Sequence, residues 1–273
     1  MRGLIKADFK RVFADKLLLV IAIIAAAFAV MTPVLYSVIF SFVDMPDELT
    51  AGMFYAKSQF FQSFSIGNNL GLIAPVLLAI IMYKDFSFGT VRNKVIMGKT
   101  RTQIFLSSFV VSTVMIIVIM LVHAFLSFGI SLIFFEYQSS PFTLDDFWYF
   151  LTSLGFEILA LLFIGALLAW LCAVAKNVGL VIVLYVAVAF GLVMLGSVTR
   201  VGCELIEMSD ASEFAKQALN FLNRINVGNS ALFIGAVEEY KLEDVLYLVL
   251  SPLFFSTILF VHGLIKFNKK DLK

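Results

Sequence analysis

The chain has 273 residues, of which 61% are hydrophobic and only 14% are charged, and 30 of them are Phe. A soluble domain is usually about half apolar, so this composition excludes an ordinary soluble globular protein. Long uncharged runs separated by clustered charges are typical of a polytopic helical membrane protein, and the formal net charge of +1 therefore indicates nothing about partners.

The first 16 residues, MRGLIKADFKRVFADK, predict an amphipathic helix that lies in the membrane interface. Ile5, Phe9, Val12 and Phe13 recur at helical spacing, and basic residues stand beside them. A charged topology signal without regular structure is the alternative.

Six apolar runs are long enough to cross a bilayer, which needs about 20 helical residues. They predict an all-α polytopic protein in which residues 1–273 form one transmembrane domain. The runs cover about residues 17–43, 62–83, 104–135, 147–174, 178–198 and 245–265.

The charged residues predict the orientation of these spans. Fifteen of the 20 Lys and Arg residues fall on the side that carries both termini, whereas 14 of the 19 acidic residues fall on the other side. Because Lys and Arg are retained on the cytoplasmic side, we expect both termini to be cytoplasmic.

The segment before the sixth run predicts re-entrant or interfacial helices. In SEFAKQALNFLNRI, the residues Phe214, Ala218, Phe221, Leu222 and Ile225 recur at helical spacing, which favours an amphipathic helix. The following NSALFIGAV is apolar enough to dip into the outer leaflet.

The connector at residues 85–103, DFSFGTVRNKVIMGKTRTQ, contains a GKT sequence that resembles the end of a phosphate-binding loop. Such a loop needs a first glycine where Asn93 stands, and it must follow a buried strand in an α/β domain. The connector is too short for that domain. We therefore reject nucleotide binding by this chain.

The same connector predicts a short helix between the second and third spans. Gly89 interrupts the preceding helix, Thr90 is a candidate N-cap, and Gly98 stands where glycine ends helices. Lys99 and Arg101 then lead into the third span.

The two faces of this short helix differ in character. Val91, Val95 and Ile96 fall on one side, whereas Arg92 and Lys99 fall on another. A helix held between two spans at the cytoplasmic surface is well placed to dock a soluble partner, although a plain positive-inside loop is an equal alternative.

The pattern D-x-x-x-G-T-V-R-N-K-x-x-x-G-K-T-R-T-Q-I, which begins at Asp85, resembles the connector of ABC-2-type permeases. These are membrane subunits of bacterial ABC exporters, including bacitracin- and lantibiotic-type transporters. The outline of the whole chain agrees with this family, but only GTVRNKVIMGKTR is close to motif level. A glutamate often stands near the position of Asp85 in that family.

The resemblance implies an exporter permease that moves a substrate, such as an antimicrobial peptide or drug, out of the cytoplasm through the bacterial cytoplasmic membrane. It implies two ABC ATPase subunits, which bind ATP and Mg, and a second permease chain, identical or homologous. It implies no enzymatic activity, no cofactor and no nucleic acid for this chain. The implied coupling residues are Asp85, Gly89, Thr90, Arg92, Asn93, Lys94, Val95, Gly98, Lys99 and Arg101.

Two polar residues fall inside predicted spans. Glu157 lies in the fourth span and His123 in the third, at depths that would allow the two side chains to meet. They form either a substrate or proton site or a buried interhelical hydrogen bond. The first reading gives a rival function, a proton-coupled secondary transporter; a membrane peptide-immunity or sensor protein is the other rival.

The outer half of the second run is unusually polar. Ser58, Gln62, Ser65 and Asn69 fall at i, i+4, i+7 and i+11, and Asn68 lies alongside them. This stripe predicts the lining of a substrate pathway, unless its first residues lie outside the membrane.

Cys172 and Cys203 have neither the spacing of a metal site nor that of a disulfide framework. We expect no metal and no catalytic residue in this chain.

Overall fold

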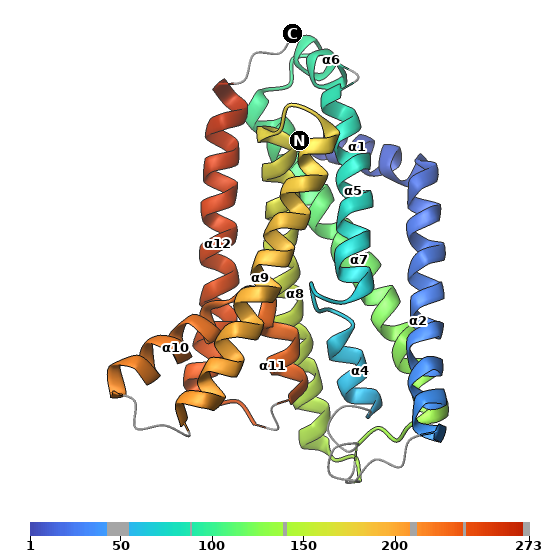
Figure 1. Ribbon diagram of the computed structural model, residues 1–273. Helices are drawn as coiled ribbons and strands as arrows, with labels where there is room; N and C mark the ends of the chain where they lie inside the picture. The colour runs from blue at the N-terminus through green and yellow to red at the C-terminus, as the bar shows by residue number, and fades with distance from the viewer. Residues whose placement is uncertain (43–54, 88, 139–140, 208–211, 237–238, 270–273) are drawn as a thin grey trace.

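The structure is a computed structural model that describes residues 1–42, 55–87, 89–138, 141–207, 212–236 and 239–269. The regular elements within these ranges are all helical, and six of the helices are long and apolar enough to cross a membrane. The predicted all-α polytopic class is therefore confirmed. The long helices run side by side (Figure 1), with α6 at one end of the bundle and α4 near the other; we call these the α6 end and the α4 end.

The N-terminal helix α1 (Arg2–Ala14) lies across the α6 end of the bundle, and α2 (Lys16–Phe42) then runs away from it. The buried side chains of α1 are Leu4, Asp8 and Val12, whereas Phe13 is exposed. A helix is therefore present over the predicted residues, and it packs on the bundle through a face that includes Asp8; its place in the membrane interface stays a prediction.

The second predicted span is not one continuous helix. A short helix, α4 (Ala56–Gln62), is separated by residues 63–68 from α5 (Asn69–Ser87). The chain turns here because Gly71 allows close approach: a Cβ on it would lie 2.0 Å from the carbonyl oxygen of Ser65. The side-chain amide of Asn68 also donates to the carbonyl of Gln62 at 3.2 Å.

Because of this break, the predicted polar stripe does not follow one helix face. Ser58 and Gln62 lie on α4, Ser65 and Asn68 lie in the non-helical segment, and Asn69 begins α5. The prediction of a single stripe is wrong for a local reason: a helical period was extended across turn-forming residues.

Two long helices form the middle of the bundle, α7 (Arg101–Phe134) and α8 (Leu144–Val174), and the short α6 (Thr90–Ile96) precedes them. α7 and α8 cross closely at Gly165, where a Cβ would lie 2.6 Å from the Cα of Thr113. Small residues at such crossings allow helix backbones to approach within a membrane.

The fifth span, α9 (Val178–Glu207), extends well beyond the predicted end at residue 198, so that Arg200 lies on a helix rather than in a loop. The sixth span is α12 (Leu242–Lys269). Between them lie α10 (Glu213–Ile225), the 3₁₀ turn η1 (Val227–Asn229) and α11 (Ser230–Ala236).

The predicted amphipathic helix before the last span is present as α10, which begins at its N-cap Ser212. α11 packs against α4 and α8, and its residues Ala231 and Ile234 are buried. The described part of the NSALFIGAV sequence, residues 229–236, thus packs within the bundle at the α4 end (Figure 1), and its insertion into the outer leaflet stays a prediction.

Aromatic packing fixes α4 inside the bundle. The buried ring of Phe60 on α4 meets rings from α4 itself, the following segment, α7 and α8, with centroid separations of 4.8 to 5.6 Å. These partners are Phe61, Phe64, Phe125, Phe128 and Phe150. Ring pairs in this range add to the stabilisation from buried area. The packed rings around Phe60 therefore fix the position of α4, from which residues 63–68 continue.

Candidate functional site

The boundaries of α6 are set by two glycines. Gly89 is its N-cap and has a left-handed φ of 69°, so Thr90 is the first helical residue and the prediction of Thr90 as N-cap is wrong. At the other end, Gly98 has a φ of 77°; its N–H donates to Val95, and the N–H of Lys99 donates to the carbonyl of Lys94. This is a Schellman motif, and the predicted stop at Gly98 is confirmed.

The threonine of the GKT sequence caps the next helix. The hydroxyl of Thr100 accepts from the N–H of Gln103 at 3.2 Å, and the Gln103 side chain accepts from the N–H of Thr100 at 3.3 Å. This capping box starts α7. Thr100 therefore has a structural role that needs no nucleotide.

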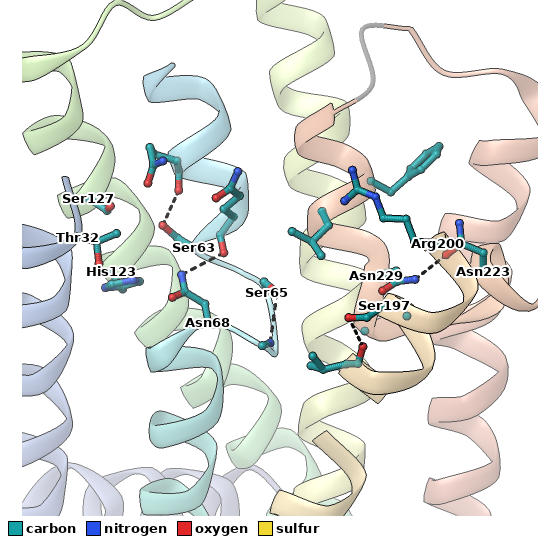
Figure 2. A pocket seen from close by; sticks show the side chains of 18 of the residues that line it. Thr32, Ser63, Ser65, Asn68, His123, Ser127, Ser197, Arg200, Asn223 and Asn229 are labelled. Atoms are coloured by element: carbon teal, nitrogen blue, oxygen red, sulfur yellow. Dashed lines mark hydrogen bonds between the residues drawn. The ribbon is translucent and has the colours of Figure 1, made fainter. Parts of the chain in front are cut away.

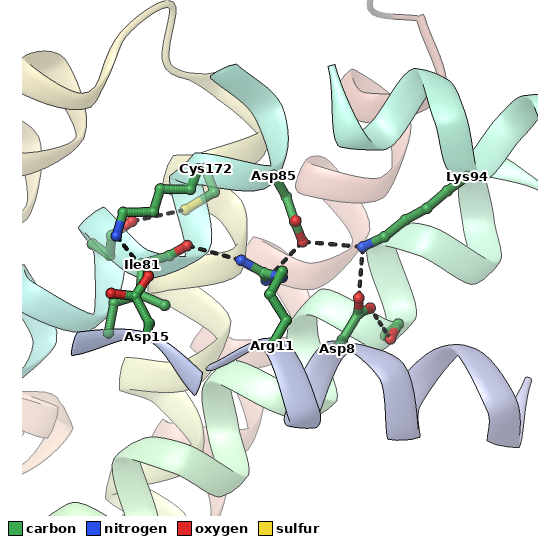
Figure 3. Close-up of polar contacts among 10 residues, drawn as sticks. Asp8, Arg11, Asp15, Ile81, Asp85, Lys94 and Cys172 are labelled. Carbon is green, nitrogen blue, oxygen red and sulfur yellow. Dashed lines mark hydrogen bonds and ion pairs between the residues drawn. The ribbon is translucent and has the colours of Figure 1, made fainter. Parts of the chain in front are cut away.

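A buried ion network lies behind α6 (Figure 3). The Lys94 ammonium lies 2.7 Å from a carboxylate oxygen of Asp8 and 3.0 Å from one of Asp85. Arg11 approaches the same Asp85 oxygen at 2.8 Å, and the hydroxyl of Ser107 donates to Asp8 at 2.6 Å. The network therefore joins α1, α5, α6 and α7.

These contacts change the reading of two predicted coupling residues. Asp85 and Lys94 are buried against each other inside this chain, so their side chains do not present themselves to a soluble partner. The short side chain of Asp85 is well suited to this position, because the lysine from α6 reaches down to it.

A second ion pair joins the C-cap residue of α1, Asp15, to α5 at the same end. The Lys84 ammonium lies 2.6 Å from the Asp15 carboxylate. Burial by itself would raise the pKa of Asp15, but hydrogen bonds from Lys84 and the Leu17 N–H, together with the charges of Lys84 and Arg11, lower that pKa below its usual 3.8. Asp15 is therefore ionised at neutral pH.

The exposed surface of α6 differs from the predicted one. Val91 is buried and Val95 is half-buried, whereas Ile96 and Met97 are 73% and 69% exposed. Arg92 and Asn93 are exposed beside them, and Lys99 is half-buried. The prediction that Ile96 shares one face with the two valines is wrong, because Ile96 is exposed and the buried position beside Val91 and Val95 is taken by Lys94.

A second candidate site is a polar cavity of about 480 Å³ near the α4 end (Figure 2). It lies between α2, residues 63–68, α7, α9 and the η1–α11 region. Four of the predicted pathway residues line it: Gln62, Ser65, Asn68 and His123. The other two, Asn69 and Glu157, are not among its lining residues.

The structure does not bring Glu157 and His123 together. The Nδ1 atom of His123 lies 3.0 Å from the carbonyl oxygen of Ala25 on α2. Glu157 is fully buried in α8, and its Oε1 atom has no hydrogen-bond partner among the described residues. The predicted hydrogen bond between them is therefore not among the contacts of the described residues.

Several lining residues were missed by the sequence reasoning. Ser197 lies near the predicted end of the fifth span and Arg200 lies beyond it on α9, while Asn223 and Asn229 come from α10 and η1. Arg200 was read as the start of a loop because it follows an apolar run. The helical spacing that continues to residue 207 was the missed signal.

Within the described part of the chain, no three His, Cys, Asp or Glu side chains group closely enough to hold an ion. Cys172 is buried, and Cys203 is partly exposed near the end of α9.

The sequence matches no protein-family model and no curated protein.

Proposed function

We propose that this chain is the permease subunit of an ATP-driven exporter, and that a separate ATPase subunit binds α6. The observation that carries the proposal is the exposed tip of α6 at Ile96 and Met97, which is backed by the buried ion network of Lys94. Exposed apolar side chains on a short, firmly capped helix are suited to a partner's cleft.

The network gives α6 a mechanical connection to the rest of the bundle. Lys94 contacts Asp8 of α1 and Asp85 of α5, while Ser107 of α7 contacts the same Asp8. A buried ion pair is costly to break. A force applied to α6 would therefore move three neighbouring helices together rather than bend one loop.

In this proposal, two ATPase subunits bind ATP and Mg, and this chain performs no covalent chemistry. It pairs with a second permease chain in the bacterial cytoplasmic membrane, with the α6 end and both termini in the cytoplasm. The substrate leaves towards the α4 end, where the polar cavity would form part of its path. A peptide or drug fits the connector's resemblance to ABC-2-type permeases.

The proton-coupled alternative has less support. It relied on a relay between Glu157 and His123, and these side chains bond elsewhere or not at all among the described residues. A peptide sensor without transport keeps some support from the polar cavity, and it predicts function in the presence of an inactive ATPase.

The test is co-purification of the chain from its native membrane, followed by identification of any ATP-binding-cassette subunit that accompanies it. Ile96→Asp should release that subunit and lower its ATPase activity, while leaving the fold intact because the side chain is exposed. Leu242→Asp is the matched control, since Leu242 is 77% exposed at the other end of the bundle. The proposal fails if both variants retain the subunit equally.

A further inference from the structure

The charged groups in the lining of the polar cavity are few and basic. Among the described residues that line it, Arg200 is the only Arg, Lys, Asp or Glu. Yet 14 of the 19 acidic residues of the chain belong to this side by the sequence count. No acidic side chain of the described residues lines the cavity, although the sequence is most acidic on this side, and this charge balance disfavours a cationic ligand.

The two walls supply hydrogen-bonding groups of different kinds. Figure 2 shows His123 and Ser127 on one wall, and Arg200 with Ser197 and Asn229 on the other. Arg200 also lies near Glu204, but the 3.6 Å separation joins two side chains that are more than half exposed. Such surface pairs contribute little, so Glu204 competes weakly for the guanidinium.

Two of the helices that line the cavity have weakly buried, apolar outer faces. α2 and α9 both contribute lining residues, and each packs against α5. They are the least buried of the six candidate spans, and they expose apolar side chains such as Leu35 and Met194. A ligand that enters between α2 and α9 would first contact these apolar side chains and then the polar groups of the cavity.

We propose that the polar cavity binds the anionic head group of a membrane-embedded amphiphile. The Arg200 guanidinium would form an ion pair with the head group, and the amide and hydroxyl groups of the cavity would donate hydrogen bonds to its remaining oxygens. The apolar chain of the amphiphile would lie between α2 and α9. Phosphate and carboxylate share this chemistry, because both present oxygens to a guanidinium fork. The site does not depend on an ATPase; where the proposed export function also holds, the amphiphile is its substrate.

The test measures binding of radiolabelled dodecyl phosphate and laurate to the full chain in a neutral maltoside detergent. Both arms are run, and saturable binding in either supports the site and tells which head group it prefers. Dodecyltrimethylammonium, which has the opposite charge, should not compete. Saturable binding of neither anion, or equal binding of the cation, would overturn the assignment.

Two variants and one control locate the site. Arg200→Gln should weaken binding of the preferred anion by about tenfold or more, and Ser197→Phe should weaken it by filling the cavity. Lys216→Gln on α10 removes a charge outside the cavity lining and should leave binding unchanged. Since micelle partitioning is the same for each variant, equal binding by Arg200→Gln and Lys216→Gln would refute the site.

The result of the anion-binding test can be distinguished from the result of the co-purification test of the export proposal. Anion binding without a co-purifying ATPase would retain the cavity assignment and reject the exporter. A co-purifying ATPase without anion binding would support the exporter and reject the cavity assignment.

Discussion

Lys94 is a residue whose role could not be foreseen from its neighbours in the sequence. It was placed with the partner-facing bases of the connector, but its ammonium bonds Asp8, which is 86 positions away in the chain. No periodic pattern specifies so distant a contact. The sequence contained a weaker signal, since Asp8 interrupts the apolar spacing of the first helix.

We expect Lys94→Met to destabilise the α6 end, because it leaves Asp8 and Asp85 buried with Arg11 as the remaining basic partner. Removing one member of a buried ion pair costs about 3 kcal/mol or more. The thermal unfolding midpoint of the purified protein should fall. Lys99→Met, outside the network, should leave it nearly unchanged.

A compensating change separates charge from packing in this experiment. Asp8→Asn in the Lys94→Met background removes one of the stranded charges and should recover part of the lost midpoint. If the double variant is no more stable than Lys94→Met alone, the charge explanation is wrong.

The Asp15–Lys84 pair predicts a pH dependence at the same end. Because the pKa of Asp15 is lowered in the folded chain, the pair stabilises the fold above the usual value of 3.8, and this contribution disappears as pH falls through the lowered value. Asp15→Asn should therefore have a lower unfolding midpoint than the parent chain at pH 6. The two midpoints should converge below about pH 3.8; a constant difference would contradict the sign.

At the scale of elements, hydropathy predicted the spans well, because a bilayer requires long apolar helices whatever their tertiary packing. The break between α4 and α5 was not predicted, because the predicted run at residues 62–83 was taken as one helix although residues 63–68, near its start, are not helical. Gly67 and Asn68 were its local signal, and a helical period was extended through them. The cavity escaped for a related reason, since it needs Arg200 on an extended α9.

The close crossing of α7 and α8 predicts that one added methyl group at Gly165 destabilises the fold. Gly165→Ala would place its Cβ 2.2 Å from the Thr113 hydroxyl oxygen and 2.6 Å from the Thr113 Cα. Backbone on the other helix cannot rotate away, so the helices must separate, at a cost of about 1–3 kcal/mol. The unfolding midpoint should fall accordingly.

Gly155→Ala on the same helix is the matched control. Nothing lies within 4 Å of a Cβ at that position, so alanine should be neutral or slightly stabilising through its better helix propensity. Equal losses in the two variants would show that the crossing tolerates the methyl group.

At the scale of the whole molecule, the proposed orientation can be measured by cysteine labelling. In a background of Cys172→Ala and Cys203→Ser, we expect Lys241→Cys to react with a membrane-impermeant maleimide in intact cells. Arg92→Cys, exposed at the α6 end, should react only after permeabilisation, because the basic side is retained in the cytoplasm. Labelling of Arg92→Cys in intact cells would reverse the assigned orientation.

The tight crossing at Gly165 divides α7 into two arms of unequal length. From Arg101 to Thr113 the helix spans about 18 Å, and from Thr113 to Phe134 about 32 Å. The short arm begins beside α6, and the long arm carries His123 in the wall of the polar cavity. If α7 pivots as a rigid rod at this crossing, a displacement of Arg101 produces a displacement of Phe134 in the opposite direction that is about 1.8 times larger. A small movement at one end of the molecule then becomes a larger movement at the other.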